Sequence, residues 1–405
     1  MKENDWTYYL KAQEHIAQHA LTNSKRPECF VKGVYQTHLK KAQGPYVWDV
    51  QDRQLYDFIC GMGSMLLGHG NQLIAEAIYR QAINGITLSL STPLEIELAE
   101  KIKECVPWIE KMKFLKTGTE ACLAALKIAR AYTGRSLVMS EGYHGWSDEF
   151  VSLTPPALGV PAQYAIESLN VAKIDDAVAA VIVEPIMVDH GQGRVEWLRD
   201  LRKKCTEHGV VLVFDEVITG FRVPKFTFSE LLGVEPDLIC LGKALGGGLP
   251  LSLVAGKAKV MECGEYFVSS TFAGETCSLA ASLNLIAQLR TTRYDLKELW
   301  NAGEYFKSKF NQLAPNKIQL MGYPSRSVFQ GDPLFKALLW QEAYKAGVLF
   351  GSSFFFSFAH IPYMDRVLNV LKDIVMRIET GAVKLEGAMP QSPFAQKMRE
   401  KKENT

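Results

Sequence analysis

The sequence lacks the features that mark several large classes of protein. It contains no apolar run close to the length of about 18 residues that a membrane span requires, no internal repeat and no low-complexity tract. Its net charge is only +1, because 45 Lys and Arg residues are balanced by 44 Asp and Glu residues. A balanced charge gives no general attraction to nucleic acid or to an anionic membrane. We therefore expect neither as a partner.

Paired cysteines are also missing. The cysteines are scattered and form no C-x-x-C motif, which argues against a disulfide framework or a zinc site; they are Cys29, Cys60, Cys105, Cys122, Cys205, Cys240, Cys263 and Cys277. Residues 1–20 are polar and mixed in charge, so they do not look like a secretion signal. We expect a cytoplasmic protein that keeps its cysteines reduced.

What the sequence does contain is typical of a large globular protein. Of its 405 residues, 47% are hydrophobic and 22% are charged, and a chain of this length can bury a large core. After residue 290 the pattern changes to longer charged helices. We expect an N-terminal arm with part of a small domain at 1–50, a large ligand-binding domain at 51–290, a C-terminal small domain at 291–390 and a disordered tail at 391–405.

Helices and strands alternate from about residue 94 onward. Before that point, residues 46–58 are typical of a β-hairpin and residues 72–83 of a helix. The expected strands are 112–116, 136–140, 178–184, 210–215, 237–241 and 251–255, the expected helices are 94–105, 119–133, 194–208 and 275–290, and a polar loop is expected from 142 to 173. Such alternation predicts an α/β fold with a mostly parallel central sheet covered on both faces, and a second, smaller α+β domain. Ligands bind such sheets beyond the carboxyl ends of the strands.

Lys243 is the most informative residue. It follows an apolar strand and precedes three glycines, Gly246-Gly247-Gly248, that let the backbone approach a ligand closely. A lysine withdrawn from water has a lowered pKa, which frees its amine to attack a carbonyl group. Asp215 ends another apolar strand, and a carboxylate there can keep a pyridine nitrogen protonated. Each residue alone is more often a solvated lysine or a helix cap, but together they suit a pyridine aldehyde that forms a Schiff base with the lysine.

A second set of residues is suited to phosphate. Thr117, Gly118 and Thr119 join a strand to a helix, where hydroxyl groups and free amides form a cradle for an anion. A plain N-cap is the alternative explanation for the same residues. Tyr143 follows the next strand, and its ring can lie flat on a heteroaromatic ring, although a surface aromatic cluster would give the same pattern. The neighbouring His144 has no histidine or cysteine at metal-ligand spacing, so we expect no metal.

The ends of two strands place further groups beside this set. If strand alternation continues past Asp215, Val217 points to the same side and can pack on a ring opposite Tyr143. Glu184 ends a neighbouring strand. We expect it either to orient loop groups or polar substrate atoms, or to form a salt bridge at the edge of the sheet.

Together these residues resemble a known family. The segments that carry the resemblance are Asp215-Glu216-Val217-Ile218-Thr219-Gly220-Phe221-Arg222-Val223, Pro236-Asp237-Leu238, Leu241-Gly242-Lys243, Gly246-Gly247-Gly248-Leu249-Pro250, Thr117-Gly118-Thr119-Glu120-Ala121, Tyr143-His144-Gly145 and Ser357-x-Ala359-His360. They closely resemble class III aminotransferases that depend on pyridoxal 5′-phosphate (PLP) and have fold type I, especially the branch similar to glutamate-1-semialdehyde 2,1-aminomutase. The resemblance runs from about residue 30 to residue 380.

The resemblance implies how these residues would act. Lys243 would carry PLP as a Schiff base and move a proton between the substrate carbon and the cofactor, while Asp215 would keep the ring nitrogen protonated. Gly118 and Thr119 would hold the phosphate, and Thr271 would reach across a two-fold homodimer to the phosphate of the partner subunit. The full set of expected cofactor-binding residues is Thr117, Gly118, Thr119, Tyr143, His144, Glu184, Asp215, Val217, Lys243 and Thr271.

The implied reaction moves an amino group between a small-molecule amino donor and a small carbonyl-bearing biosynthetic intermediate. An intramolecular aminomutase, an amino-acid decarboxylase on the same fold and a regulatory protein that only binds the cofactor are alternatives, and the retained amine argues against the last. The substrate stays open because Glu28 stands where an arm arginine is expected, with Arg26 nearby, and Ser352 replaces an acidic residue. Arg326 is either a ligand for an anionic substrate or an exposed structural arginine.

Overall fold

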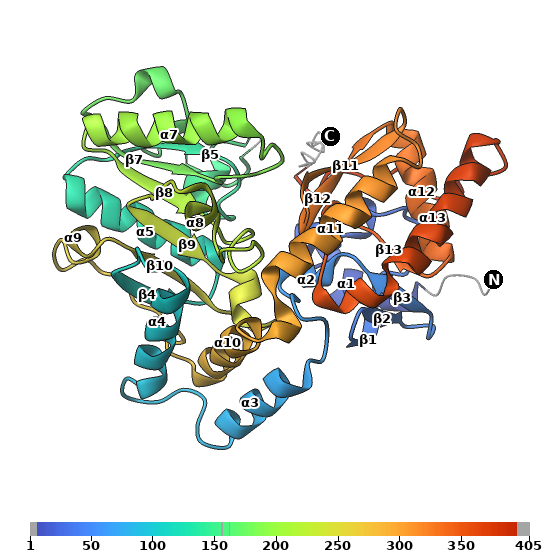
Figure 1. Cartoon of the computed structure of the whole chain (residues 1–405), viewed down its shortest axis with the longest axis horizontal. Coiled ribbons are helices and arrows are strands. Elements are labelled where there is room, and N and C mark those ends of the chain that lie inside the picture. The colour runs from blue at the N-terminus through green and yellow to red at the C-terminus, as the bar shows by residue number, and fades with distance from the viewer. Residues whose placement is uncertain (1–5, 155–156, 162, 395–405) are drawn as a thin grey trace, which may run out of the picture.

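The structure is a computed structural model that describes residues 6–154, 157–161 and 163–394 (Figure 1). The predicted C-terminal tail is described as far as Phe394, and its remainder lies outside these ranges. Figure 1 shows a larger part around a central sheet and a smaller part built from both ends of the chain. Within the described ranges, no helix combines the length and the apolar character needed to cross a bilayer.

The larger part is built on a seven-stranded sheet with the order β4-β10-β9-β8-β7-β5-β6. Its strands are β4 (Lys111–Leu115), β5 (Leu137–Glu141), β6 (Ile166–Ser168), β7 (Val178–Val183), β8 (Val211–Asp215), β9 (Leu238–Leu241) and β10 (Ser252–Gly256). The strands from β6 across to β9 pair in parallel, whereas β10 runs antiparallel to both β4 and β9. The predicted α/β fold with a mostly parallel sheet is confirmed.

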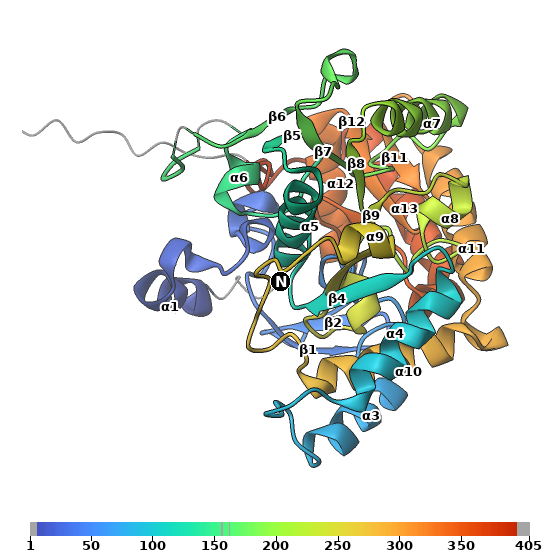
Figure 2. The same ribbon diagram turned by 90° about the vertical axis from the view of Figure 1, so that its left-hand side faces the viewer.

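Helices cover both faces of this sheet, because its central strands carry apolar side chains on both sides. Val211 and Val213 of β8 belong to a buried cluster with alanines of α5 (Gly118–Thr133). Leu212 and Phe214 of the same strand belong to a different cluster, which includes leucines of α7 (Gln192–Glu207). Figure 2 shows β7 and β8 between these two helices. Strand β8 is thus held from both sides, and its end is a rigid support for Asp215.

Short elements, including a 3-10 helix at Val171–Lys173, lie where the sequence predicted a polar loop. Residues 142–173 contain α6 (Asp148–Val151) and β6, and β6 pairs in parallel with β5. A strand of three residues is too short to leave an alternating pattern in the sequence. The remaining helices of the larger part are α3 (Gln72–Ala82), α4 (Pro93–Cys105), α8 (Phe228–Leu232), α9 (Ala258–Met261) and α10 (Thr276–Leu289).

The smaller part combines residues from both ends of the chain. One sheet consists of β1 (Leu39–Gln43), β2 (Tyr46–Asp49), β3 (Gln54–Asp57) and β13 (Val348–Leu349), and another of β11 (Ile318–Tyr323), β12 (Arg326–Gly331) and β14 (Phe354–Phe355). The predicted hairpin is present, since Tyr46 pairs with Tyr56 in antiparallel register. The helices are α1 (Thr7–His15), α2 (Cys60–Gly63), α11 (Leu296–Asn311), α12 (Pro333–Lys345) and α13 (Met364–Glu379). Where one domain ends and the next begins remains a proposal.

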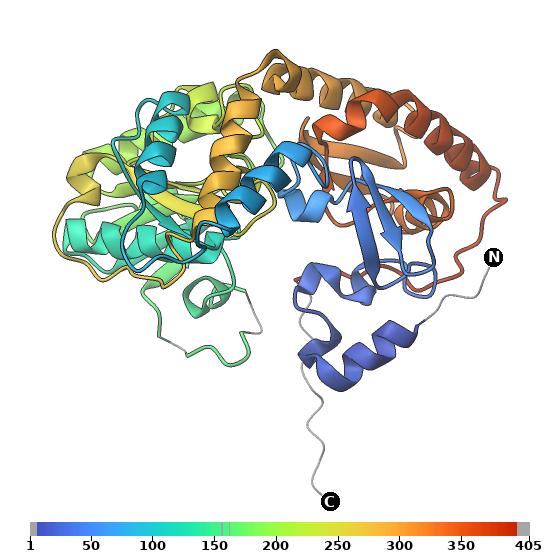
Figure 3. The ribbon, with the colours of Figure 1, turned by 90° about the horizontal axis from the view of Figure 1, so that it is seen from below.

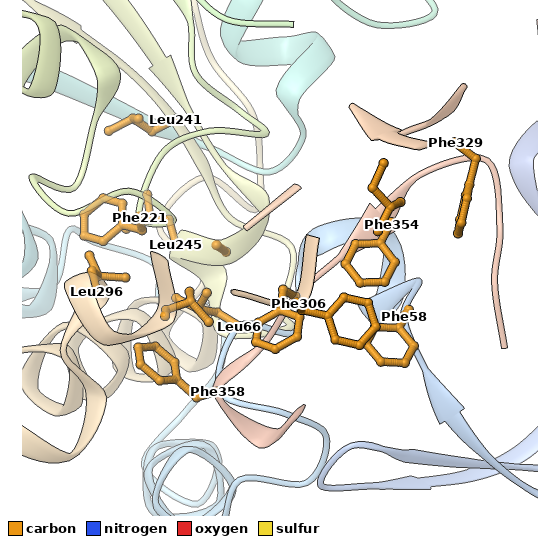
Figure 4. Packing of buried hydrophobic residues seen from close by; sticks show 14 of the residues in the cluster. Phe58, Leu66, Phe221, Leu241, Leu245, Leu296, Phe306, Phe329, Phe354 and Phe358 are labelled. Atoms are coloured by element: carbon orange, nitrogen blue, oxygen red, sulfur yellow. The ribbon is translucent and has the colours of Figure 1, made fainter. Parts of the chain in front are cut away.

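In the smaller part, stacked aromatic rings join the segment after β3 to residues from the C-terminal third of the chain (Figure 4). Phe58 stacks on Phe354 with ring centroids 4.8 Å apart, and Phe306 of α11 stacks on Phe354 at 5.4 Å. All three side chains are buried, and each removes a large apolar surface from water. The cluster fixes the segment after β3 against β14, and both of these segments continue to the cavity described next.

Candidate active site

A cavity of about 910 Å³ lies beyond the carboxyl ends of the parallel strands. Its walls include residues that follow β4, β5, β7, β8 and β9. All of the cofactor-binding residues expected from the sequence line it except Thr271. The smaller part closes the other side with residues such as Arg326 and Phe355. The cavity therefore lies between the two parts of the molecule.

Lys243 follows β9, in a short turn that begins after Gly242. Its φ of +45° lies in the left-handed region, which costs a residue with a side chain about 1–3 kcal/mol. Burial lowers the pKa of the Lys243 amine, although the carboxylates of Asp215 and Glu184 act in the opposite direction. A lowered pKa and a strained backbone within a cavity are typical of a lysine that acts as a nucleophile.

The buried carboxylate of Asp215 accepts hydrogen bonds on both oxygens. Oδ2 lies 2.7 Å from His144 Nδ1 and 3.4 Å from the Cys122 thiol, and Oδ1 accepts from the amide of Val217 at 3.0 Å. An ionised carboxylate only accepts, so His144 donates through Nδ1. Burial acts to raise the pKa of Asp215, but the contacts with His144 and the Val217 amide outweigh it, and the pKa lies below its usual value. The carboxylate is thus kept ionised and fixed in direction.

Cys122 is a part of this site that the sequence did not single out. The ligand atoms of Cys122, His144 and Asp215 lie within 4.8 Å of one another, although they come from α5, the loop after β5 and the end of β8. Asp215 bonds to both of the others, and His144 Nε2 faces the carbonyl of Glu141 at 3.1 Å. One pattern in the sequence could have indicated that Cys122 lies near the site. Positions three apart share a face of a helix, and Thr119 lies three residues before Cys122.

The start of α5 is a helix cap and a candidate anion cradle. The hydroxyl of Thr117 accepts from the amide of Glu120 at 3.2 Å, and the Glu120 carboxylate accepts from the amide of Thr117 at 2.8 Å. The amide of Ala121 bonds to the Thr117 carbonyl, so the amides of Gly118 and Thr119 precede the first bond within the helix. These two amides are available to an anion in the cavity. The N-cap explanation is confirmed by the capping box, and the anion cradle stays a prediction.

Two glycines keep this cradle open. A Cβ atom on Gly118 would lie 2.8 Å from the side chain of Val217, and one on Gly145 would lie 2.2 Å from the hydroxyl of Thr119. Gly145 also has a φ of +118°, which residues with a side chain seldom adopt. A larger residue at either position would displace a wall of the cavity.

Tyr143 and Glu184 are joined at one side of the cavity. Glu184 Oε1 accepts from the amide of Tyr143 at 2.9 Å, so Glu184 orients the loop after β5. Burial, followed by repulsion from Asp215, raises the pKa of Glu184. The Tyr143 ring is half-exposed and contacts the ring of Phe394, with centroids 5.3 Å apart. Phe394 carried no signal in the sequence, because only the folded chain brings the C-terminal segment to this loop.

Two charged residues of the N-terminal arm, Arg26 and Glu28, form contacts with the C-terminal segment and within the arm. Arg26 Nη2 donates to the carbonyl of Pro393 at 3.3 Å, and Glu28 forms an ion pair with Lys32 at 2.7 Å. Neither Arg26 nor Glu28 lines the cavity, whereas Ser352 does. The arm therefore does not supply the substrate-binding arginine considered from the sequence.

Thr271 is exposed and lies outside the cavity of its own chain. Its loop leads to Glu275, which accepts from the amide of Cys277 at the start of α10 and forms an ion pair with Lys116 at 3.0 Å. Lys116 itself lines the cavity. The loop is thus attached at the edge of the cavity while Thr271 lies outside it, and the role of Thr271 in a partner subunit remains a prediction.

Comparison with protein families identifies the class of protein that this fold and site define. The sequence profile of class-III aminotransferases matches residues 31–163 and 159–322, which is more than half of the chain. The chain belongs to the class-III aminotransferase family, and is therefore a member of a family of enzymes. The family resemblance predicted from the sequence is confirmed.

Within that family, two curated relatives with the same name are similar to this chain in sequence. The glutamate-1-semialdehyde 2,1-aminomutase of Laribacter hongkongensis (strain HLHK9) is 36% identical over 274 residues, which cover 60% of this chain and 64% of the relative. The protein of the same name from Aquifex aeolicus (strain VF5) is 36% identical over 281 residues, or 62% of this chain and 66% of the relative. The chain thus matches slightly less than two thirds of the length of these relatives.

Solved structures show the same fold over nearly the whole chain. The FumI protein of Sphingopyxis sp. MTA144, solved as its PLP internal aldimine form, superposes with a TM-score of 0.86 and 24% identity, covering 95% of this chain and 98% of that protein. A β-phenylalanine aminotransferase from Variovorax paradoxus superposes with a TM-score of 0.81 and 26% identity, covering 93% and 94%. The predicted fold class is confirmed by these likenesses as well.

Proposed function

We propose that the chain is a PLP-dependent aminotransferase that moves an amino group between a small-molecule amino donor and a small carbonyl-bearing biosynthetic intermediate, with Lys243 as the residue that binds the cofactor covalently. One observation carries the proposal. A single cavity holds a lysine amine of lowered pKa, a buried carboxylate of lowered pKa and the free amides of a helix start. These are the groups that a phosphorylated pyridine aldehyde requires.

The residues of the cavity fit PLP. The amides of Gly118 and Thr119 are available to a phosphate, and Gly118 and Gly145 leave room for it because a side chain at either position would collide with a neighbour. Asp215 offers an ionised carboxylate to a ring nitrogen, and Lys243 offers an amine to an aldehyde. A volume of about 910 Å³ is near the upper end for ligand cavities, so a small substrate fits beside the cofactor.

The residues around the cavity have separate tasks in this reaction. PLP, when bound, supplies an aldehyde for amines and a ring that withdraws electrons from the substrate carbon. Lys243 takes a proton from that carbon and returns one, because its lowered pKa increases the fraction of neutral amine. Asp215 holds a proton at the ring nitrogen, and its bonds to His144 and the Val217 amide keep the carboxylate oriented.

A two-fold dimer is part of the proposal. Large apolar side chains are exposed on α3, on the segment that follows it and on the Thr271 loop: Tyr79, Ile83, Ile86, Leu88, Leu90, Phe267 and Phe272. The segment after α3 lies against the end of that loop, because the Thr276 hydroxyl donates to the carbonyls of Gly85 and Ile86. Exposed apolar groups gathered in this way are typical of an interface between proteins. A partner on this face would bring its own Thr271 loop to the cavity.

An intramolecular aminomutase is the second candidate. Its support is the 36% identity to proteins named glutamate-1-semialdehyde 2,1-aminomutase. An aminomutase turns over without a separate amino donor, whereas an aminotransferase requires one. A donor screen with the holoenzyme separates the two, and release of carbon dioxide in the same assay would instead indicate a decarboxylase.

Covalent attachment of the cofactor tests the proposed function directly. Protein incubated with PLP is reduced with borohydride, digested and measured by mass spectrometry. We expect the mass of the reduced cofactor on the peptide that contains Lys243, and its loss in Lys243→Ala. Lys203→Ala is the matched control, because Lys203 is exposed on α7. Attachment that persists in Lys243→Ala, or that never occurs in the wild-type protein, would contradict the proposal.

A further inference from the structure

Arg326 is a cation of the cavity that forms no ion pair with an acidic side chain in the described part of the chain. It lies at the start of β12, and its side chain lines the cavity together with those of Lys243 and Lys116. Lys116 is paired with Glu275 at 3.0 Å, and Lys243 is assigned above to the cofactor. Among the residues that the structure describes, no carboxylate lies within 4.0 Å of the Arg326 guanidinium. Its charge is therefore available to a ligand.

Most of the hydrogen-bond donors of Arg326 also have no partner among the described residues. Nη1 donates to the carbonyl of Met187 at 2.5 Å, while Nε is buried and has no partner in the described part of the chain. A guanidinium carries five N–H donors in a fixed fork. A wholly structural arginine looks different here, because Arg222 uses Nε and both terminal nitrogens to bond to the carbonyls of Gly63 and Phe356.

An oxyanion bound to Arg326 would neutralise its charge and accept hydrogen bonds from its free N–H groups. A buried N–H of a charged group without a partner is unfavourable, and the two oxygens of a carboxylate or a phosphate match the guanidinium fork. We propose that Arg326 binds an oxyanion of the amino substrate, either a carboxylate or a phosphate ester, and so selects substrates that carry one. This inference rests on the proposed function, because it gives the substrate class of the same cavity.

The surroundings of Arg326 place the oxyanion beside the reacting groups. Its partner Met187 is in the loop after β7 that begins with Glu184, and Arg326 pairs across the sheet with Phe355, which also lines the cavity. Arg326 also interacts electrostatically with Glu184. Burial and the charge of Asp215 raise the pKa of Glu184, and the charge of Arg326 opposes this rise weakly. A substrate with an amine at Lys243 and an oxyanion at Arg326 thus spans a single cavity.

A purely structural role makes a different prediction. The bond to Met187 alone would tie the loop after β7 to β12. In that case the loss of Arg326 would disturb the cavity in the same way for every amine. A comparison of anionic amines with neutral amines of the same shape separates the two roles.

The experiment follows single-turnover reaction of the holoenzyme by its cofactor absorbance, with matched amines. L-Alanine is compared with isopropylamine, β-alanine with propylamine, and O-phosphoethanolamine supplies the phosphate ester. We expect Arg326→Gln to raise the half-saturating concentration of the anionic amine by about 10- to 100-fold, and to leave the neutral amine within about threefold. Whether a carboxylate or the phosphate ester shows the larger loss identifies the oxyanion.

Two further variants keep the result interpretable. Arg199→Gln removes the same charge from an exposed position on α7 and should behave as wild type. Arg326→Lys retains the charge without the fork and should give an intermediate loss for anionic amines. It also replaces Arg326→Gln if thermal melting shows that the glutamine variant does not fold.

Equal losses for anionic and neutral amines, or no loss for either, would overturn the inference. If no amine reacts although PLP is attached to Lys243, the proposed function fails, and titration calorimetry with propionate and inorganic phosphate then decides the role of Arg326. Binding of either anion that disappears in Arg326→Gln supports it, and the absence of binding to the wild-type holoenzyme refutes it.

Discussion

Burial of a single ring sets the charge state of His360. Its side chain is buried in the smaller part, and Nδ1 accepts from the amide of Ser357 at 3.1 Å, so this nitrogen carries no proton. Burial lowers the pKa of His360 from 6.5 to about 4, against the attraction of Asp57, and with support from the neighbouring His69 and Arg222. The folded protein therefore holds a neutral ring at this position.

This lowered pKa makes the stability of the protein sensitive to acid. Because His360 titrates at about 4 when folded and near 6.5 when unfolded, the unfolded chain binds the proton more readily between these values, and stability falls as the pH decreases through that range. Between pH 7.5 and pH 5.5 we expect a loss on the order of 1 kcal/mol from this residue. Urea midpoints at the two pH values measure it.

The variant His360→Gln should lack this part of the pH dependence, although its midpoint at pH 7.5 will already be lower because a buried contact is changed. His15→Gln is the control, since His15 is exposed at the end of α1. If His360→Gln loses as much stability as the wild-type protein on acidification, the neutral buried ring is not the cause.

At the scale of elements, the sequence predicted the long helices and strands but not the very short ones. The long helices α4, α5 and α10 and the buried strands β7 and β8 begin and end close to the predicted residues. Each helix spans several turns of its apolar pattern, and each strand is an almost uninterrupted apolar run. Strands β13 and β14 have only two residues each, which leaves no period to detect. Their place is decided by distant partners, as in the pairing of β13 with β3.

The residues of the candidate site also fall into two groups, those that a local motif predicts and those that only the packing of distant segments brings together. Lys243, Asp215 and Thr119 stand within local motifs at strand ends, so the sequence was enough to bring them to one edge of the sheet. Cys122 and Phe394 contact the site through the packing of α5 and through the path of the C-terminal segment. No local pattern encodes such contacts, because they depend on how whole elements pack.

The loop after β5 provides a prediction at this scale. Gly145→Ala would place a Cβ atom 2.2 Å from the Thr119 hydroxyl and force that residue away from the cradle. We expect PLP to bind about 10- to 100-fold more weakly, as measured by equilibrium dialysis.

The matched control is Gly134→Ala at the end of α5. Gly134 also has a positive φ, +69° compared with +118° at Gly145, but a Cβ atom there would meet no atom of the described residues within 4 Å. This variant should lose about 1 kcal/mol of stability through backbone strain and keep its affinity for PLP. Equal weakening of PLP binding in the two variants would show that strain, and not the collision with Thr119, is responsible.

At the scale of the whole molecule, the cavity depends on parts that are distant in sequence. The sheet of the larger part supplies Lys243 and Asp215, the smaller part supplies Arg326 and Phe355, and the C-terminal segment supplies Phe394. Our proposal adds the Thr271 loop of a second subunit. Each site would then be complete only when two chains meet.

That proposal predicts complementation between two defective variants. Lys243→Ala removes the amine, and Thr271→Glu would place a negative charge against the phosphate in the partner's site. In a mixed dimer, one of the two sites combines an intact Lys243 with an intact Thr271. Random assembly of co-expressed subunits would make about a quarter of all sites intact. We expect borohydride-fixed PLP at about that level, and almost none in either variant alone.

The control is co-expression of Thr271→Glu with a chain that carries both substitutions. No mixed dimer of that pair has an intact site, so PLP attachment should not recover. Attachment at the wild-type level in Thr271→Glu alone would refute the exchange of loops between subunits, while Lys243 could still be the residue that binds PLP.

The N-terminal arm, which lies below the smaller part in Figure 3, contacts the segment that leads to Phe394. The amide of Ala388 bonds to the Lys32 carbonyl at 2.8 Å, and that of Gln391 bonds to the Glu28 carbonyl at 2.7 Å. From there the backbone leads to Phe394 in the cavity wall. A change in the segment around Pro393 and Phe394 would therefore alter a wall of the cavity, although these residues are about 150 positions from Lys243 in the sequence. Shortened versions of the protein intended for kinetic work should therefore keep the chain through Phe394.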